Sequence, residues 1–363
     1  MTKRNFNTLP SQSGYRLPAE WEHHEATWLG WPHNKSDWPG KFTPVPWVYA
    51  EIVRRISAPG WGSSTGEKAR IIVESKEHEK QARKVLKSAN VDVTNVEFFT
   101  LKTDRGWTRD SGPQFVKNAD GIAQVNFKFN GWAKYSNYRK DRKLPEFISK
   151  KLGLTSFIPE YNGRHVVLEG GSIDTNGKGT LITTEECLLD EETQVRNPGF
   201  TEEDYKKVFR DYLGITNVLW FGKGIAGDDT HGHVDDLCRF VNAKTLLLVQ
   251  EKHQRDENYK PLQENKERLQ GFRLEDGSKP EAAFLPMPEP VIFKGQRLPA
   301  SYANFYISNS AVLVPIFDDP NDKTALGIIG ELINDRPVIG IHALDLVWGL
   351  GTLHCLTHEQ PGK

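Results

Sequence analysis

The first candidate for chemistry is a nucleophile, Cys355, near the end of the sequence. A thiol attacks carbon as a thiolate, and an ordinary thiol with a pKa of ~8.5 is only a few per cent ionised at neutral pH. Cys355 therefore needs a cationic neighbour that lowers its pKa, and His233 is the candidate. Two glycines before it, Gly349 and Gly351, would let the backbone approach closely. The alternative for Cys355 is a buried, inert cysteine.

Two aspartates, Asp110 and Asp235, indicate what the nucleophile would attack. Two buried carboxylates that face each other repel unless a cation lies between them. A guanidinium supplies that cation, because its planar fork binds carboxylates bidentately. Trp107 could stack on such a ligand, although a core tryptophan is the alternative. Each aspartate could instead cap a turn or pair with a neighbouring arginine, Arg109 or Arg239.

The segment HGHVD carries the strongest competing signal, a metal site. On a strand, His231, His233 and Asp235 would face the same side, and Asp236 follows. A metal-dependent hydrolase is therefore the alternative function. Against it, the remaining histidines show no second HxH or HxxxH grouping. Without a metal, His233 would serve as general acid and base, and Glu169 is the candidate to orient it. We expect no metal and no cofactor.

Each of these polar residues stands just before or at the start of a predicted hairpin strand. The four segments are RGWTRDSGPQFV (105–116), VVLEGGSI (166–173), GDDTHGHVDDLC (227–238) and WGLGTLHCLT (348–357). Equivalent strand ends meet near one end of the axis in a pseudo-symmetric array. The sequence therefore predicts that Asp110, Glu169, His233, Asp235 and Cys355 share one pocket.

Four predicted hairpins recur along the chain, with turns near Asn118, Asn176, Asn242 and Asn309. Helices are predicted between them, at 77–89, at 322–333 and after Thr201, whose hydroxyl would cap EEDYKKVFRDYL. A further unit around 26–32 and 69–75 gives five. Five such units predict an α/β propeller, and because no low-complexity linker divides the chain, we expect one domain over residues 1–363.

Composition narrows the class of protein. The net charge of −1 is not the excess of positive charge that binding to nucleic acid or anionic lipid requires, so a small molecule is the expected partner. No segment reaches the ~18 apolar residues that a membrane span requires, and the first residues lack the apolar core of a secretory signal. Three cysteines are few and odd in number, which favours a cytoplasmic protein. Cys187 and Cys238, beside apolar residues in strand patterns, are interpreted as inert.

Seven ordered blocks over nearly the whole chain resemble the agmatine deiminases, which are grouped with the bacterial peptidylarginine deiminase type. The blocks are RLPAEWEHHEATWLGWPH (16–33), GWTRDSGP (106–113), LEGGSI (168–173), TLITTEECLL (180–189), GHVDD (232–236), VPIFDDPND (314–322) and LHCLTHEQP (353–361). The resemblance implies a metal-free, five-bladed α/β propeller, or pentein. It also implies conversion of agmatine to N-carbamoylputrescine and ammonia in the cytoplasm, a step of putrescine and polyamine biosynthesis.

By motif match, the resemblance places the family's nucleophile on Cys355 and its acid/base histidine on His233. The guanidinium carboxylates fall on Asp110 and Asp235, and the histidine-orienting glutamate on Glu169. A substrate-lining tryptophan matches Trp107.

The chain also departs from the family pattern. It reads GLGTLHC where GGGNIHC is usual, has His231 where Asp or Asn precedes the Gly-His pair, and lacks the Gly-Gly that commonly follows the tryptophan in GWAKYSNYRKD (131–141). We therefore expect the side of the pocket that holds the substrate's tail to differ from the family pattern. Arginine and peptidyl arginine are alternative substrates. A homodimer is a possible assembly.

Overall fold

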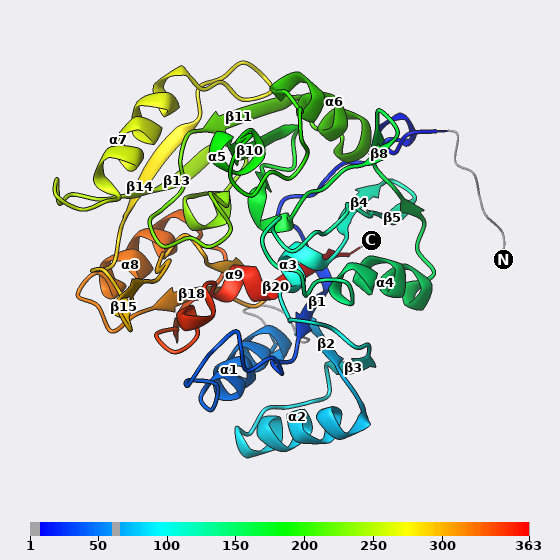
Figure 1. The fold of residues 1–363 in the computed structure, drawn as a ribbon. Helices are drawn as coiled ribbons and strands as arrows, with labels where there is room; N and C mark the ends of the chain where they lie inside the picture. The colour runs from blue at the N-terminus through cyan, green and yellow to red at the C-terminus, as the bar shows by residue number, and fades with distance from the viewer. Residues whose placement is uncertain (1–7, 60–65, 363) are drawn as a thin grey trace.

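The protein is described by a computed structural model that covers residues 8–59 and 66–362. Its architecture is α/β, as predicted, with mixed sheets inside and long helices at the periphery (Figure 1). Within the described ranges, no helix combines the length and apolar character that crossing a bilayer requires.

Five mixed sheets of three or four strands form the framework of the described chain. In sheet order they are β20 (Thr357–Pro361), β1 (His24–Gly30), β2 (Lys68–Val73) and β3 (Val96–Thr100); β4 (Gln114–Asn118), β5 (Gly121–Val125) and β6 (Ser156–Phe157); β11 (Asn217–Phe221), β10 (Thr180–Thr184) and β9 (Asp174–Thr175); β12 (Cys238–Phe240), β13 (Thr245–Gln250) and β14 (Glu281–Pro286); β17 (Tyr306–Ile307), β18 (Val312–Ile316) and β19 (Val338–His342). Two small ribbons pair β7 (Glu160–Tyr161) with β8 (Arg164–His165) and β15 (Ile292–Phe293) with β16 (Gln296–Arg297).

Helices link the parallel strand pairs of these sheets. The long ones are α1 (Val45–Ser57), α2 (Lys76–Ser88), α4 (Leu144–Leu152), α6 (Glu202–Leu213), α7 (Tyr259–Arg268) and α8 (Asp322–Leu332). Short helical turns are α3 (Thr108–Ser111), α5 (Glu185–Leu188), α9 (Leu353–Leu356), η1 (Ser11–Ser13), η2 (Asp141–Lys143), η3 (Gly170–Ser172), η4 (Val234–Asp236), η5 (Leu269–Gly271) and η6 (Val347–Gly349). Because each unit is an antiparallel hairpin followed by a helix and a parallel strand, the predicted repetition is confirmed.

The hairpin turns form where asparagines were expected, for a local reason. Asn118, Asn176 and Asn242 each accept backbone N–H groups with Oδ1, from residues two positions on and then three or four on, at 2.9 to 3.1 Å. Such a side chain stabilises a turn without distant contacts. Asn309 differs, since it exchanges hydrogen bonds with the backbone of His24.

The predicted helices are also confirmed. Helix α6 begins with a capping box, in which the Thr201 side chain accepts the N–H of Asp204 and the Asp204 carboxylate accepts the N–H of Thr201. The helix ends at Gly214, which has φ 70° and so adopts the left-handed conformation that favours glycine.

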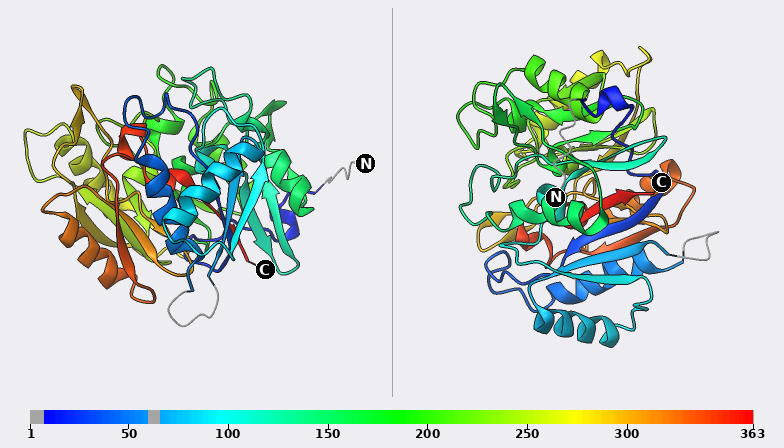
Figure 2. Two further views of the ribbon diagram at one scale, coloured as in Figure 1. Left: turned by 90° about the horizontal axis from the view of Figure 1, so that it is seen from below. Right: turned by 90° about the vertical axis from the view of Figure 1, so that its right-hand side faces the viewer.

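The remaining sheet joins the two ends of the described chain. The predicted strands at 26–32 and 69–75 are β1 and β2, which pair in parallel. Strand β20 pairs antiparallel with β1, and Trp28 lies opposite His358 (Figure 2). The helical turns α3 and α9 lie near the middle of the molecule in Figure 1. The sheet therefore places the chain segment that carries Cys355 beside the segment that follows β1.

Candidate active site

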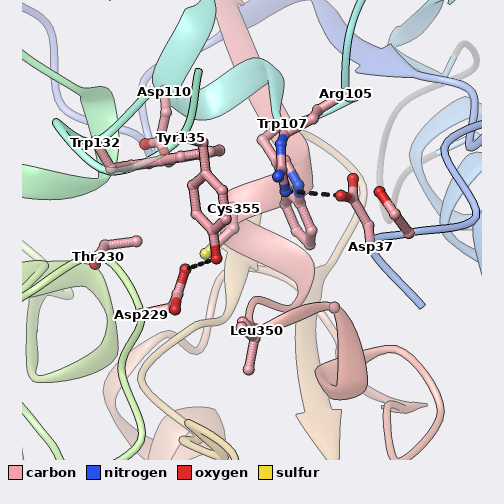
Figure 3. Close-up of a pocket in the computed structure, with 12 residues that line it drawn as sticks. Asp37, Arg105, Trp107, Asp110, Trp132, Tyr135, Asp229, Thr230, Leu350 and Cys355 are labelled. Carbon is pink, nitrogen blue, oxygen red and sulfur yellow. Dashed lines mark hydrogen bonds and ion pairs between the residues drawn. The ribbon is translucent and has the colours of Figure 1, made fainter. Parts of the chain in front are cut away.

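A cavity of about 90 Å³ contains the candidate nucleophile (Figure 3). Its lining residues are Ser36, Asp37, Arg105, Trp107, Asp110, Trp132, Tyr135, Asp229, Thr230, Gly349, Leu350 and Cys355. Figure 3 shows Trp107 and Trp132 on either side of Cys355. The cavity is thus a polar pocket with aromatic walls.

Short helical turns before the hairpin strands deliver the reactive side chains. Asp110 belongs to α3, before β4, and Asp235 belongs to η4, before β12. Cys355 belongs to α9, before β20, and Glu169 directly precedes η3. Turn α3 contacts both α9 and η3, and η3 contacts η4. The predicted gathering of these segments is confirmed.

Cys355 is buried and its sulfur has two polar neighbours. Asn304 donates from Nδ2 to Sγ at 3.1 Å, and Sγ lies 3.7 Å from Oδ2 of Asp235. Burial raises the pKa of Cys355 well above its ordinary value, and the charge of Asp235 raises it further. The expectation that His233 lowers this pKa is not met here, because the charges that act most strongly on the thiol are those of Asp235, Asp236 and Asp110.

The glycine before the nucleophile has the role expected of it. A methyl group on Gly351 would lie 2.9 Å from the Trp107 ring and 3.2 Å from Sγ of Cys355. Gly349 likewise presses against the Trp38 ring, where a methyl group would lie 2.5 Å from Nε1. Larger residues would push the aromatic wall or the sulfur out of place.

The two candidate guanidinium ligands, Asp110 and Asp235, converge on Gly171. A methyl group there would lie 3.0 Å from Oδ1 of Asp110, 3.0 Å from Oδ2 of Asp235 and 2.5 Å from Nδ1 of His233. Asp110 accepts the Gly171 N–H at 3.0 Å and the Trp132 indole N–H at 2.8 Å. The absence of a side chain on Gly171 lets these groups approach one another.

The pKa values of the two carboxylates shift in opposite directions. Burial raises the pKa of Asp110 to about 6, opposed by His233 and reinforced by Asp235. Burial also opposes ionisation of Asp235, but the hydrogen bond from His354, at 2.7 Å, lowers its pKa. Neither carboxylate pairs with Arg109 or Arg239, whose ion pairs are with Glu20, Asp174 and Glu359.

His233 lies between two carboxylates. Its Nδ1 is 3.9 Å from Asp110 Oδ1, and its Nε2 is 3.7 Å from Glu169 Oε2. Burial opposes its protonation, but Asp110, Cys187 and Glu169 together raise the pKa of His233 well above its ordinary value. The ring is therefore a cation that can give up a proton.

Glu169 is fully buried behind His233, where the sequence placed it. Arg196 Nε lies 3.3 and 3.2 Å from the two Glu169 oxygens. Burial opposes the charge of Glu169, but Arg196 and His233 lower its pKa. Glu169 is thus a fixed anion that can orient the imidazolium.

Cys187 is buried but does not lie in the strand that its apolar neighbours indicated. It lies in helix α5, and its sulfur and ligand atoms of Glu169 and His233 lie within 4.8 Å of one another. The motif TEECLL was the only sequence signal for this placement.

The alternative metal cluster of His231, His233 and Asp235 does not form. His231 has φ 64°, and its Nε2 lies 2.8 Å from Oδ2 of Asp190 instead. HGHVD does not adopt the strand on which that alternative depends, because the backbone turns at His231 and Gly232 and enters η4. The two clusters of potential metal ligands in the described ranges, Glu169 with Cys187 and His233, and Asp235 with Asp236 and Cys355, both exclude His231.

In the outer part of the pocket, Trp107 was anticipated and its neighbours were not. Trp107 packs on Trp38, with ring centroids 5.5 Å apart, and leaves one face on the cavity. Arg105 pairs with Asp37 at 2.7 Å, and its guanidinium lies 4.1 Å from the centroid of Tyr135. Tyr135 in turn donates to Asp229 at 2.6 Å. The rim of the pocket therefore contains two carboxylates, Asp37 and Asp229, one paired with a guanidinium and the other with a phenol.

The chain matches the family model described as Porphyromonas-type peptidyl-arginine deiminase over residues 16–361. It is 31% identical over 381 residues to the agmatine deiminase of Pseudomonas aeruginosa strain LESB58, and 98% of each chain is covered. A solved structure of agmatine deiminase of Enterococcus faecalis superposes with a TM-score of 0.89 at 28% identity, covering 99% of this chain and 100% of that chain. The structure of a Cys-to-Ser variant of C. jejuni agmatine deiminase with substrate bound superposes with a TM-score of 0.82 at 28% identity. It covers 95% of this chain and 96% of that chain.

Proposed function

Because this chain belongs to the family of Porphyromonas-type peptidyl-arginine deiminases, we propose that it hydrolyses agmatine to N-carbamoylputrescine and ammonia. The observation that carries the proposal is a buried thiol 3.7 Å from Asp235, in a pocket that also presents Asp110. The full-length similarity to agmatine deiminases supports the choice of substrate. The small cavity, about 90 Å³, favours a free guanidine over peptidyl arginine.

The first step of the proposed mechanism is binding of the guanidinium between Asp110 and Asp235. The cation favours the ionised form of Asp110, whose pKa of about 6 is raised chiefly by burial. The same cation lies beside Cys355 and lowers the pKa of its thiol, which burial and Asp235 had raised. The thiol of Cys355 therefore releases one proton to solvent when the guanidinium cation binds in the pocket.

The thiolate then adds to the guanidinium carbon, which the carboxylates hold in attack geometry. The His233 imidazolium protonates the departing nitrogen, the C–N bond breaks, and ammonia leaves an amidino thioether on Cys355. Neutral His233 next takes a proton from water, whose hydroxide adds to the same carbon. As the C–S bond breaks, the hydroxyl proton passes to solvent, and the urea product and the thiolate separate.

The proposed architecture is a five-bladed propeller, or pentein, in one domain over residues 1–363. Its support is the recurrence of hairpin, helix and parallel strand in four sheets, and a fifth sheet in which β20 takes the place of a hairpin partner beside β1. A cytoplasmic location is consistent with three free cysteines. A homodimer stays a prediction, which light scattering of the purified protein tests.

The test is ammonia release from agmatine, arginine and a peptide with C-terminal arginine, compared by kcat/KM. We expect agmatine to be preferred and Cys355→Ala to release no ammonia while it still binds agmatine in calorimetry. The matched control is Cys238→Ala, which removes another buried thiol, in β12, and should retain turnover. Turnover by Cys355→Ala at the wild-type rate would refute the nucleophile.

A further inference from the structure

A row of three buried side chains leads away from the pocket, and two of them, His354 and Glu20, have no part in the mechanism above. Nδ1 of His354 lies 2.7 Å from Oδ2 of Asp235, and its Nε2 lies 2.8 Å from Oε2 of Glu20. All three side chains are less than a tenth exposed. The row Asp235–His354–Glu20 therefore connects a guanidinium carboxylate to a second acid behind it.

The two contacts of His354 differ in what they require of the ring. Each joins a ring nitrogen to a carboxylate oxygen, so a hydrogen bond forms where that nitrogen carries a proton. Burial lowers the pKa of His354 well below its ordinary value, and Arg109 and Arg239 add to this effect. A neutral ring has one N–H, and donation of that N–H from Nδ1 along the 2.7 Å contact leaves Asp235 ionised as its acceptor.

Glu20 is held from its other side by two arginines. Its Oε2 lies 3.3 Å from Nη2 of Arg109 and 3.0 Å from Nη2 of Arg239. These arginines also pair with Glu359, at 2.7 Å, and Asp174, at 3.1 Å. The acid behind His354 therefore cannot swing away from the ring without breaking several buried ion pairs.

The backbone of His354 is fixed independently of its side chain. Its N–H donates to Oδ1 of Asn304 at 3.0 Å, and its carbonyl accepts Nε of Arg109 at 3.3 Å. A substitution that changes only the ring should therefore leave α9, and the position of Cys355, in place.

Two adjacent acids show what the His354 contact does. Asp235 and Asp236 are both buried, and burial opposes the charge of each. The pKa of Asp236 is raised well above its ordinary value, first by burial and then by the charge of Asp235. The pKa of Asp235 is lowered, and His354 is the main group that offsets burial. The histidine thus determines which of the two acids carries charge.

We propose that His354, held by Glu20, is a positioning residue that keeps Asp235 ionised and directed at the substrate guanidinium. The proposal rests on the proposed function for its substrate, but its effect on Asp235 does not depend on that substrate. His354 acts through Asp235, and the groups that face its ring are Asp235, Glu20, Arg109 and Arg239.

Two amide substitutions of His354 separate the contacts that its two ring nitrogens make. Asn places a donor near the position of Nδ1 and should keep the bond to Asp235, whereas Gln places one near Nε2 and should keep only the contact with Glu20. We expect His354→Asn to retain agmatine kcat/KM within about threefold, and His354→Gln to lose about tenfold to hundredfold, mainly through KM. In His354→Gln the acid limb of kcat/KM should also move to higher pH, because Asp235 takes up a proton more readily.

A second measurement needs no substrate. The charge of Asp235 raises the pKa of Cys355, so losing that charge should make the thiol ionise more easily. Iodoacetamide labelling of the peptide that contains Cys355, followed by mass spectrometry at neutral pH, should therefore be faster in His354→Gln than in wild type or His354→Asn. In an Asp235→Asn background, His354→Gln should change the labelling rate no further.

Equal losses in the Asn and Gln variants, or an unchanged labelling rate in His354→Gln, would overturn the proposal and leave a purely structural role. If His354→Gln alone does not fold, Asp235→Asn/His354→Gln should fold, because no buried charge then lacks a partner, and failure of that double variant also overturns it. Absence of ammonia release by the wild type refutes the proposed function instead, and the labelling order still decides the role of His354.

Discussion

The indole of Trp132 donates a hydrogen bond to Oδ2 of Asp110 at 2.8 Å, which ties an aromatic wall of the pocket to one of its carboxylates. The other oxygen of Asp110 accepts the Gly171 N–H. Both bonds favour the ionised carboxylate over its protonated form. Trp132 therefore has an electrostatic role in addition to its contribution to the cavity surface.

Trp132→Phe should raise the pKa of Asp110 above about 6, because one donor to the carboxylate is lost. We expect kcat/KM for agmatine to fall by roughly fivefold at neutral pH, the effect of one hydrogen bond worth about 1 kcal/mol. The acid limb of the pH profile of kcat/KM should move to higher pH. Trp28→Phe is the control, since it removes an indole bond to Gln360 and should lower stability without moving the limb.

The wild-type pH profile follows from the two groups beside the substrate. Guanidinium binding requires ionised Asp110, whose pKa is raised to about 6 chiefly by burial, so kcat/KM should fall about tenfold per pH unit below that value. Protonated His233, whose pKa is raised well above 6.5, should place the basic limb above neutral pH. Recovery of activity on return to neutral pH distinguishes titration from unfolding. A flat profile down to about pH 4 contradicts the assignment of Asp110.

Gly171→Ala should remove activity, because its methyl group would lie 2.5 Å from His233 Nδ1 and 3.0 Å from each aspartate. We expect kcat/KM to fall by at least about a hundredfold, with a loss of about 1 to 3 kcal/mol in stability from overpacking. The control is Gly327→Ala in helix α8, where a methyl group meets nothing within 4 Å. That variant should keep its activity and gain roughly 0.5 to 1 kcal/mol of stability. An active Gly171→Ala enzyme would show that the three groups need not be this close.

Substitutions of His231 and His233 distinguish the deiminase reaction from a metal-dependent hydrolysis. His231 pairs with Asp190 away from the pocket, so His231→Ala should keep ammonia release within about twofold. His233→Ala should lose at least about a hundredfold, because it removes the acid and base. Treatment with EDTA should leave the wild-type rate unchanged. Equal losses in both variants together with inactivation by EDTA would favour the metal reaction.

Local patterns predicted much of this protein. The Asn118, Asn176 and Asn242 turns bond within four residues, so the hairpins can be identified from short segments. Cys355 and Asp110 could be identified because their residue types limit the chemistry they perform. The shared position of these residues followed from the repetition of the hairpins.

The parts that the sequence did not predict depend on distant or backbone-specific contacts. His354 pairs with Glu20, 334 residues earlier, and no local pattern marks that pairing. The alternative metal site required HGHVD to be a strand, but the N–H groups of Gly232 and His233 donate to Asp228, and the backbone turns. The glycine between the two histidines was the available signal. The apolar neighbours of Cys187 indicated a strand, whereas the residue lies in helix α5 and approaches His233.

The pairing of β20 with β1 has a consequence for biosynthesis. A ribosome makes residues 24–30 early and must add more than three hundred others before residues 357–361 can pair with them. Cys355, the proposed nucleophile, lies two residues before that late strand, so a nascent chain lacks the proposed active site until translation is almost finished. A message that ends before Cys355 therefore yields a product without the proposed nucleophile.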